Sequence, residues 1–152
     1  MRIVDGKQYM DQVKRLLLEY TGKLGRDLTF QGLDEELKDP GKKYTAPEGE
    51  LLVALDGNRN AVGMIAYHRF SDECCEMKRL YVAPECRGEK LGEQLIEQLL
   101  SHAKQAGYRE MVLDTIVPLR AAIHLYQKFG FQECEPYYNN PMDDAIYMKK
   151  VL

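Results

Sequence analysis

One short block, residues 80–92, holds the clearest chemistry in the sequence. It reads LYVAPECRGEKLG and runs from an apolar, strand-like stretch through a turn into the start of a long helix. The first backbone N–H groups of a helix have no partner within it and lie at the positive end of its dipole, so they can bind a pyrophosphate. Gly88 and Gly92 allow the backbone to approach such a ligand, and Arg87 and Lys90 add positive charge. The block is therefore a candidate phosphate-binding turn.

Taken alone, this block is a weak signal. Glu89 and Glu93 at the start of the helix weigh against an anion, although they also suit the helix dipole. A strand, a turn and a helix with two glycines also describe an ordinary capped helix. The block has neither the lysine–serine pair of a nucleotide-hydrolase loop nor the Gly-x-Gly-x-x-Gly run of dinucleotide-binding proteins, so both of those classes are disfavoured.

The strand that leads into the block changes the parity of its apolar residues. Cys75 and Met77 are apolar at odd positions, whereas Leu80 and Val82 are apolar at even ones. One extra residue near Arg79, as in a β-bulge, would exchange the two faces in this way. A strand end that is buried on both faces explains the pattern equally well.

The rest of the chain supplies the elements that must position this block. Apolar residues at helical spacing predict helices at Lys7–Tyr20, Leu33–Lys38, Glu89–Ala106 and Leu119–Phe129. Apolar runs predict strands at Glu50–Asp56, Ala61–Phe70, Cys75–Val82, Met111–Leu113, Phe131–Cys134 and Ala145–Val151. Gly22 and Gly25 are expected to close the first helix, and residues 42–49 to form a loop. This order, with helices first, predicts an α/β (α+β) sandwich: a mixed central β-sheet flanked by helices, in a single domain spanning residues 1–152.

The composition disfavours several classes of function. The chain has 152 residues, 45% hydrophobic and 30% charged, which is typical of a soluble globular protein. A net charge of -3 gives no reason to expect a nucleic acid or an anionic membrane as partner. Residues 1–5 become polar too soon for a signal peptide, and no apolar run approaches the roughly 20 residues that cross a bilayer. We therefore expect a cytoplasmic protein.

The cysteines and histidines do not indicate a metal. The cysteines are Cys74, Cys75, Cys86 and Cys134, and the histidines are His68, His102 and His124. No Cys-x-x-Cys pair or clustered Cys/His spacing supports a zinc site. Free thiols in a reducing compartment are expected, and no metal is predicted.

Two blocks together resemble a known family. Residues 87–92 resemble motif A of the GNAT N-acetyltransferase superfamily, in which an arginine or glutamine is followed by a glycine at the fourth position and a glycine or alanine at the sixth. Residues 122–131 (AIHLYQKFGF) are similar to the helix-to-strand signature of motif B, and residues 76–82 look like the family's fourth strand. Two departures are visible. Lys90 stands where the family most often has its first glycine, and Leu119 stands where an asparagine often precedes the helix.

The resemblance implies the GNAT fold, with a bulged fourth strand. It also implies transfer of an acetyl group from acetyl-coenzyme A to a primary amine, by direct attack in a ternary complex. In this arrangement the bulge leaves backbone N–H groups free to hold the acetyl carbonyl. The implied cofactor-binding residues are Leu80, Tyr81, Val82, Arg87, Gly88, Glu89, Lys90, Leu91, Gly92 and Tyr126. The two departures keep open an alternative, a non-catalytic acyl-coenzyme A sensor of the same fold.

The resemblance also implies catalytic roles. Tyr126 takes the place of the motif B tyrosine that acts as general acid toward the coenzyme sulfur, although its spacing also fits the apolar face of its helix. Glu76 is a candidate general base, directly or through water, because acetyl transfer needs a neutral amine. A solvated strand residue or an ion pair with Lys78 or Arg79 is the other interpretation of Glu76. Asp114 is a lesser candidate base.

The acceptor is left open by the sequence. A small-molecule amine or a peptide amine is implied, and family members often pair as homodimers through the far end of the sheet. The loop at residues 135–141 carries the adjacent Tyr137 and Tyr138, which point in opposite directions on an extended backbone. We predict that one of them contacts the acceptor, the other interpretation being that they pack on the prolines of the loop.

Overall fold

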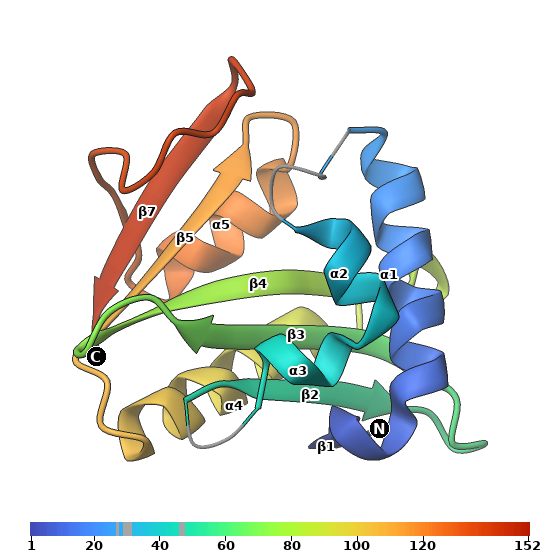
Figure 1. Cartoon of the computed structure of the whole chain (residues 1–152). Helices are drawn as coiled ribbons and strands as arrows, with labels where there is room; N and C mark the ends of the chain where they lie inside the picture. The colour runs from blue at the N-terminus through green and yellow to red at the C-terminus, as the bar shows by residue number, and fades with distance from the viewer. Residues whose placement is uncertain (27, 29–31, 46–47) are drawn as a thin grey trace.

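A mixed sheet with helices on both faces runs through the molecule (Figure 1). The structure is a computed structural model that describes residues 1–26, 28, 32–45 and 48–152. Within those residues the sheet has seven strands in the order β1-β2-β3-β4-β5-β7-β6. The strands are β1 (Arg2–Asp5), β2 (Glu50–Leu55), β3 (Ala61–Arg69), β4 (Cys74–Val82), β5 (Glu110–Ile116), β6 (Gln132–Glu133) and β7 (Ala145–Val151). The helices are α1 (Met10–Leu24), α2 (Leu33–Lys38), α3 (Pro40–Lys43), α4 (Leu91–Gln105) and α5 (Arg120–Lys128), with short 3-10 helices at Gly6–Tyr9 and Pro84–Cys86. The predicted mixed sheet flanked by helices is confirmed.

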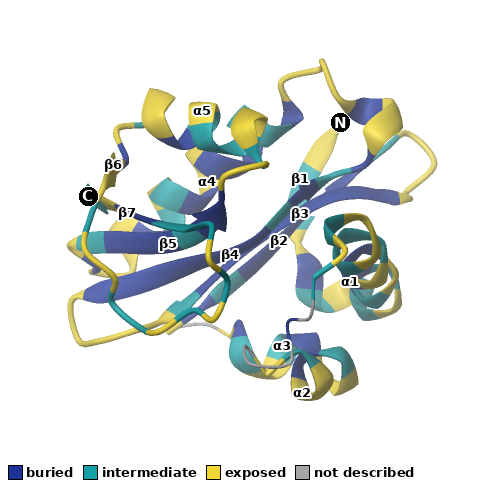
Figure 2. Cartoon of the chain, turned by 90° about the horizontal axis from the view of Figure 1, so that it is seen from above, coloured by how far each residue is buried: buried dark blue, intermediate teal, exposed yellow. Residues whose placement is uncertain are grey.

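The helices divide between the two faces of the sheet. Figure 2 shows α1, α2 and α3 on one face, and α4 and α5 on the other. Successive side chains of a strand point to opposite faces. Leu51 and Val53 of β2 therefore pack in one apolar cluster with α1, whereas Leu52 and Ala54 pack in another with α4. Burial on both faces explains why β2 and β3 read as almost continuous apolar runs.

The first helix differs from its predicted bounds at both ends. It begins at Met10, after a 3-10 turn, and ends at Leu24. Gly25 closes it in the left-handed conformation with φ 66°, as predicted. Gly22 does not end the helix and lies within its last turn.

Three other elements correct the sequence prediction. A short edge strand at Arg2–Asp5 was not predicted, so the expectation that helices come first is wrong at the start of the chain. The predicted loop at 42–49 starts late, because Pro40–Lys43 forms a helical turn with the proline at its first position, where no N–H is needed. The strand predicted at 111–113 extends over Glu110–Ile116, because its polar residues line a cavity and do not mark a strand end.

The predicted bulge is present in β4. Met64 pairs with Tyr81 and Ala66 pairs with Lys78, so one residue of β3 faces two residues of β4 between these pairs. Arg79 is one of those two, and its φ of 63° lies in the left-handed region that a side chain disfavours. The change in the parity of the apolar residues is therefore a true bulge.

A buried ion pair holds the bulge against α2. Arg79 donates through Nε to Glu36 Oε2 (2.9 Å) and through Nη2 to Glu36 Oε1 (3.0 Å), and Tyr44 also donates to Oε1 (3.0 Å). The two charged side chains are 3% and 1% exposed. Burial alone would raise the pKa of Glu36, but its hydrogen bonds and the charge of Arg79 lower that pKa below the ordinary value. The strained backbone of β4 is thus fixed by a partner from another layer.

The strands β4 and β5 stay together for only a short distance. Their parallel register runs from the pair Cys74–Glu110 to the pair Glu76–Val112, and beyond it the two strands diverge (Figure 1). Among the described residues, the edge of β4 that follows Glu76 therefore has no strand partner on the β5 side. Unpaired backbone groups are costly inside a protein, so a gap of this kind is suited to a ligand that can hydrogen-bond to them.

The ion pair leads to the first prediction. Glu36→Ala removes the carboxylate and leaves the buried guanidinium of Arg79 without this partner, so we expect the free energy of unfolding in urea to fall by about 3–5 kcal/mol. Glu35→Ala is the matched control, because the Glu35 side chain is 78% exposed, and its loss should stay below about 1 kcal/mol. Equal losses in the two variants would contradict this role for the pair.

Candidate active site

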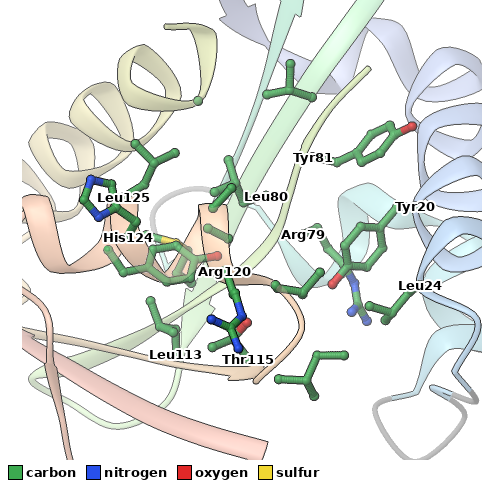
Figure 3. A pocket seen from close by; sticks show the side chains of 18 of the residues that line it. Tyr20, Leu24, Arg79, Leu80, Tyr81, Leu113, Thr115, Arg120, His124 and Leu125 are labelled. Atoms are coloured by element: carbon green, nitrogen blue, oxygen red, sulfur yellow. The ribbon is translucent and has the colours of Figure 1, made fainter. Parts of the chain in front are cut away.

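A cavity of about 810 Å³ opens where β4 and β5 have separated. Its walls come from β4, β5, the start of α4, the helix α5 and the end of α1. Figure 3 shows Tyr20 and Leu24 of α1 on one side of it and His124 and Leu125 of α5 on the other. The volume is that of a typical site for a small molecule or cofactor.

The turn before α4 forms one end of the cavity. α4 begins at Leu91, and no side chain caps its first N–H groups. Leu91 and Gly92 both line the cavity, so the positive end of the helix dipole borders this space. Gly88 has φ 93°, and a Cβ placed there would meet no atom within 4 Å. Open backbone, uncapped N–H groups and nearby cations fit a pyrophosphate at this end.

Lys90 keeps the geometry that a glycine usually supplies. Its φ is 58°, so this lysine adopts the left-handed conformation at a cost of about 1–2 kcal/mol relative to ordinary backbone. The departure from motif A therefore changes the side chain at this position while the turn itself is retained. The Lys90 side chain also lines the cavity, where its charge favours an anion.

Nearly all of the predicted cofactor-binding residues meet in this cavity. Those that line it are Leu80, Tyr81, Val82, Arg87, Gly88, Lys90, Leu91, Gly92 and Tyr126. Glu89 is exposed and does not line it, so its charge lies outside the space where an anion would bind. At Gly92 a Cβ would come within 3.1 Å of Leu125 Cδ1, so this glycine also lets α4 pack closely against α5.

Tyr126 lies on α5 and lines the cavity while only 7% exposed. Among the described residues, its hydroxyl makes no hydrogen bond, and its ring packs edge-on against Phe131 with ring centroids 6.0 Å apart. Burial raises the pKa of Tyr126 above its ordinary value, and the charges of Tyr20 and Asp114 act in the same direction. The hydroxyl therefore keeps its proton at neutral pH and is available to a ligand.

Glu76 lies outside the cavity lining and is fully engaged. His68 Nε2 donates to its Oε1 (2.7 Å), Tyr137 donates to its Oε2 (2.5 Å), and Lys78 Nζ lies 3.8 Å from Oε2. Burial would raise the pKa of Glu76, but the bond from His68, the charge of Lys78 and the bond from Tyr137 lower it to about 2. A carboxylate with so low a pKa is a poor base, so these contacts favour the ion-pair interpretation of Glu76.

Asp114, unlike Glu76, lines the cavity. It lines the cavity from β5, and its side chain is 5% exposed. Its Oδ2 accepts hydrogen bonds from Tyr138 and from Asn140 Nδ2 (2.7 Å). Tyr137 and Tyr138 do not line the cavity, so the loop uses both hydroxyls to hold carboxylates and contributes Asn140 to the lining instead.

Several polar residues of the cavity lining were not predicted from the sequence, among them Tyr20, Lys78 and Arg120. Tyr20 was absorbed into the apolar stripe of its helix, Lys78 was considered only as an ion-pair partner, and Arg120 carries no motif. The signal that could have revealed this part of the site was Lys78, a cation in the middle of a buried strand. Such a residue requires a partner or a ligand.

The described residues contain neither a membrane-spanning helix nor a metal-binding cluster. No helix in that part of the chain is long and apolar enough to span a membrane. No group of three or more His, Cys, Asp or Glu side chains is arranged there to hold a metal ion.

Comparison with known proteins places the chain in a family. The model of the acetyltransferase (GNAT) family matches residues 11–131. An uncharacterized N-acetyltransferase of Schizosaccharomyces pombe is 48% identical over 93% of this chain and 88% of its own length. The structure is similar to an acetyltransferase of the GNAT family from Staphylococcus aureus Mu50 (TM-score 0.83, 20% identity, 99% of this chain and 98% of that one). It also resembles an aminoglycoside 6'-N-acetyltransferase complexed with coenzyme A (TM-score 0.74, 18% identity, 99% of this chain and 97% of that one). The chain belongs to the GNAT acetyltransferase family.

The contacts of Glu76 lead to the second prediction. A carboxylate whose pKa falls from 4.5 to about 2 on folding stabilises the folded state above pH 4.5, by on the order of 3 kcal/mol, and this contribution is lost as the pH falls toward 2. Glu76→Gln should therefore lower the free energy of unfolding at pH 7 and flatten its decline below pH 4.5. Glu73→Gln, on a side chain that is 64% exposed, is the control and should change neither. An unchanged acid profile in Glu76→Gln would contradict the assignment.

Proposed function

We propose that this protein is an N-acetyltransferase that binds acetyl-coenzyme A in the cavity between β4 and β5 and passes its acetyl group to a primary amine. One observation carries the proposal. The divergence of β4 and β5 brings the bulge of β4, the uncapped start of α4 and the hydroxyl of Tyr126 to one surface. Membership of the GNAT family and the fold shared with a protein complexed with coenzyme A support it.

The cofactor would be held at two places. The N–H groups at the start of α4, with Arg87 and Lys90, would bind its pyrophosphate. The backbone of β4 around Leu80, Tyr81 and Val82 would receive the pantetheine and hydrogen-bond the acetyl carbonyl, because this edge has no strand partner. N–H donors aimed at that oxygen stabilise the negative charge that develops on it during transfer.

Two side chains would move protons. When bound, acetyl-coenzyme A supplies the acetyl group as a thioester. A bond forms between the amine nitrogen and the acetyl carbon, and the carbon–sulfur bond breaks. Asp114, the carboxylate beside the unpaired edge, would accept the proton that the amine loses, and Tyr126 would give its hydroxyl proton to the departing thiolate. Burial makes Tyr126 a weaker acid, but it raises the basicity of a thiolate leaving into the same apolar surroundings as well.

The rival interpretation is a sensor that binds acyl-coenzyme A without turnover. Release of free thiol on mixing acetyl-coenzyme A with a panel of amines separates the two, because a sensor releases none. The hydroxyl of Tyr126 favours the enzyme, because Tyr126 lines the cavity and its hydroxyl makes no hydrogen bond with a described residue.

The third prediction tests the cofactor site. Acetyl-coenzyme A at 100 times its dissociation constant should stabilise the protein by about 2.7 kcal/mol, seen as a rise in melting temperature. Gly88→Glu should abolish this rise, because it blocks the backbone and adds negative charge. Gly107→Glu is a closely matched control. Gly107 has φ 96°, close to the 93° of Gly88, and a Cβ at either position would have open space around it. Unlike Gly88, Gly107 lies outside the cavity lining. A full rise in folded Gly88→Glu would count against this site.

The fourth prediction tests the proton donor. Tyr126→Phe should reduce turnover about 10²- to 10⁴-fold while the dissociation constant for acetyl-coenzyme A stays nearly unchanged, because only the hydroxyl is removed. Tyr67→Phe is the control, since Tyr67 is 1% exposed and does not line the cavity. Single-turnover measurements keep the chemical step visible. Wild-type rates in Tyr126→Phe under those conditions would make the residue part of the apolar packing only.

A further inference from the structure

We propose that the acceptor is an amine with a carboxylate on the adjacent carbon, as in a free amino acid, and that Asp114 binds its ammonium group while Lys78 binds its carboxylate. This inference rests on the proposed function and names the class of substrate for the same cavity. It is carried by the placement of the two side chains at the acceptor end of the cavity, defined here as the part lined by Tyr20, Lys78, Arg79, Asp114 and Asn140.

Lys78 is a buried cation with unused donors. It lies on β4 directly before the bulge, lines the cavity, and has a side chain that is only 6% exposed. Within the described part of the chain its ammonium group makes no hydrogen bond, and the carboxylate oxygens of Glu76 and Asp114 nearest to it are both 3.8 Å away. An ammonium has three donors and is costly to bury unless they are satisfied. A carboxylate from the cavity side would satisfy them.

Asp114 is held so that one oxygen remains for a ligand. Its Oδ2 accepts from Tyr138 and from Asn140, which fixes the orientation of the carboxylate. Its Oδ1 is the atom that lies 3.8 Å from Lys78 Nζ, and Oδ1 accepts no hydrogen bond from a described residue. The unused acceptor and the unused donors therefore lie side by side.

The spacing of this pair selects an amine with an adjacent carboxylate. The ammonium and carboxylate groups of an α-amino acid are bonded to the same carbon, so their charges are a few ångströms apart. The 3.8 Å between Lys78 Nζ and Asp114 Oδ1 matches such a separation, with each ligand charge facing the opposite protein charge. Charge-assisted hydrogen bonds of this kind are the strong ones.

The charges at this end disfavour a polycation. Asp114 is the carboxylate that lines the acceptor end in the described part of the chain, and Lys78 and Arg79 are the cations that line it. The charge of Arg79 is met by Glu36, and Lys78 lies 3.8 Å from a carboxylate oxygen of Glu76 and of Asp114. A polyamine or aminoglycoside carries no carboxylate, so it would place none of its groups opposite Lys78, whereas each of its positive charges would add to those of Lys78 and Arg79.

The same arrangement would place the amine near the point of transfer. Asp114 lies close enough to Tyr126 for its charge to contribute to the raised pKa of that phenol. An amine bound to Asp114 Oδ1 would share the cavity with the Tyr126 hydroxyl that is proposed to protonate the thiolate, because both residues line it. Binding and chemistry would then use one short stretch of the cavity.

Matched acceptors test the inference on the wild-type protein. Each L-amino acid is compared with its carboxamide, in which the carboxylate is neutralised, and with its decarboxylated amine, from which the carboxylate is removed. All three compounds keep the same side chain. Free-thiol release should show KM for at least one amino acid about 10- to 100-fold below that for its amide and its amine. Titration calorimetry on the protein saturated with coenzyme A should show the same order of affinities without any reaction.

Two variants test whether Lys78 causes the preference for an amino acid over its amide. Lys78→Met should raise KM for the amino acid to about that for its amide, so that the variant no longer distinguishes the two acceptors. Lys43→Met is the matched control, a half-buried lysine close enough to Lys78 for the charge of Lys78 to help lower its pKa, but outside the cavity lining. It should leave the preference intact. If Lys78→Met does not fold, the wild-type comparison of acid, amide and amine still decides the class of acceptor.

Two outcomes would overturn the inference, and they are distinguishable. Thiol release with amides, amines or polyamines at least as efficient as with amino acids would refute the amino-carboxylate acceptor while the proposed acetyltransferase function stands. The absence of thiol release with every acceptor, together with the absence of a thermal shift with acetyl-coenzyme A, would refute both.

Discussion

The structure depends on the separation of β4 from β5. The two strands share three register pairs, ending at Glu76 and Val112, and then leave a wedge in the middle of the sheet. A sheet normally satisfies its backbone by continuous pairing, so such a wedge must be held open by other contacts. The bulge at Arg79 contributes by turning the end of β4, and its positive φ is sustained by the buried pair with Glu36. α2 thus acts on the site through one ion pair, even though it does not line the cavity.

A second set of contacts fixes the charges around the wedge. Glu76 accepts hydrogen bonds from His68 and Tyr137, and Asp114 accepts hydrogen bonds from Tyr138 and Asn140. The loop before β7 therefore donates hydrogen bonds to a carboxylate on each of the two strands that border the gap. Because the two carboxylates have very different surroundings, they have different roles. Glu76 stabilises the folded state, whereas Asp114 lines the cavity and its Oδ1 accepts no hydrogen bond from a described residue.

The sequence predicted the mixed sheet and most helices, because each leaves a local pattern of apolar residues or glycines. The bulge was one of two interpretations of the pattern, and the family resemblance favoured it. The block at 87–92 and Tyr126 could be assigned to one site because the resemblance supplied their relation across the chain. The roles of Glu76 and Asp114 could not be separated, since the difference depends on His68 and on the loop near Tyr137, which only folding brings to them. The left-handed backbone of Lys90 was equally invisible, because a lysine seldom adopts it. The edge strand β1 is too short to show an alternation.

The central claim is that the wedge between β4 and β5 receives the thioester of acetyl-coenzyme A. A crystal structure of the protein with acetyl-coenzyme A tests it most directly. We predict the pyrophosphate on the backbone of residues 88–92, the acetyl carbonyl on N–H groups of β4 near Leu80, and the sulfur beside Tyr126. A cofactor bound elsewhere, or bound at the start of α4 with its acetyl group turned away from β4 and Tyr126, would contradict the account.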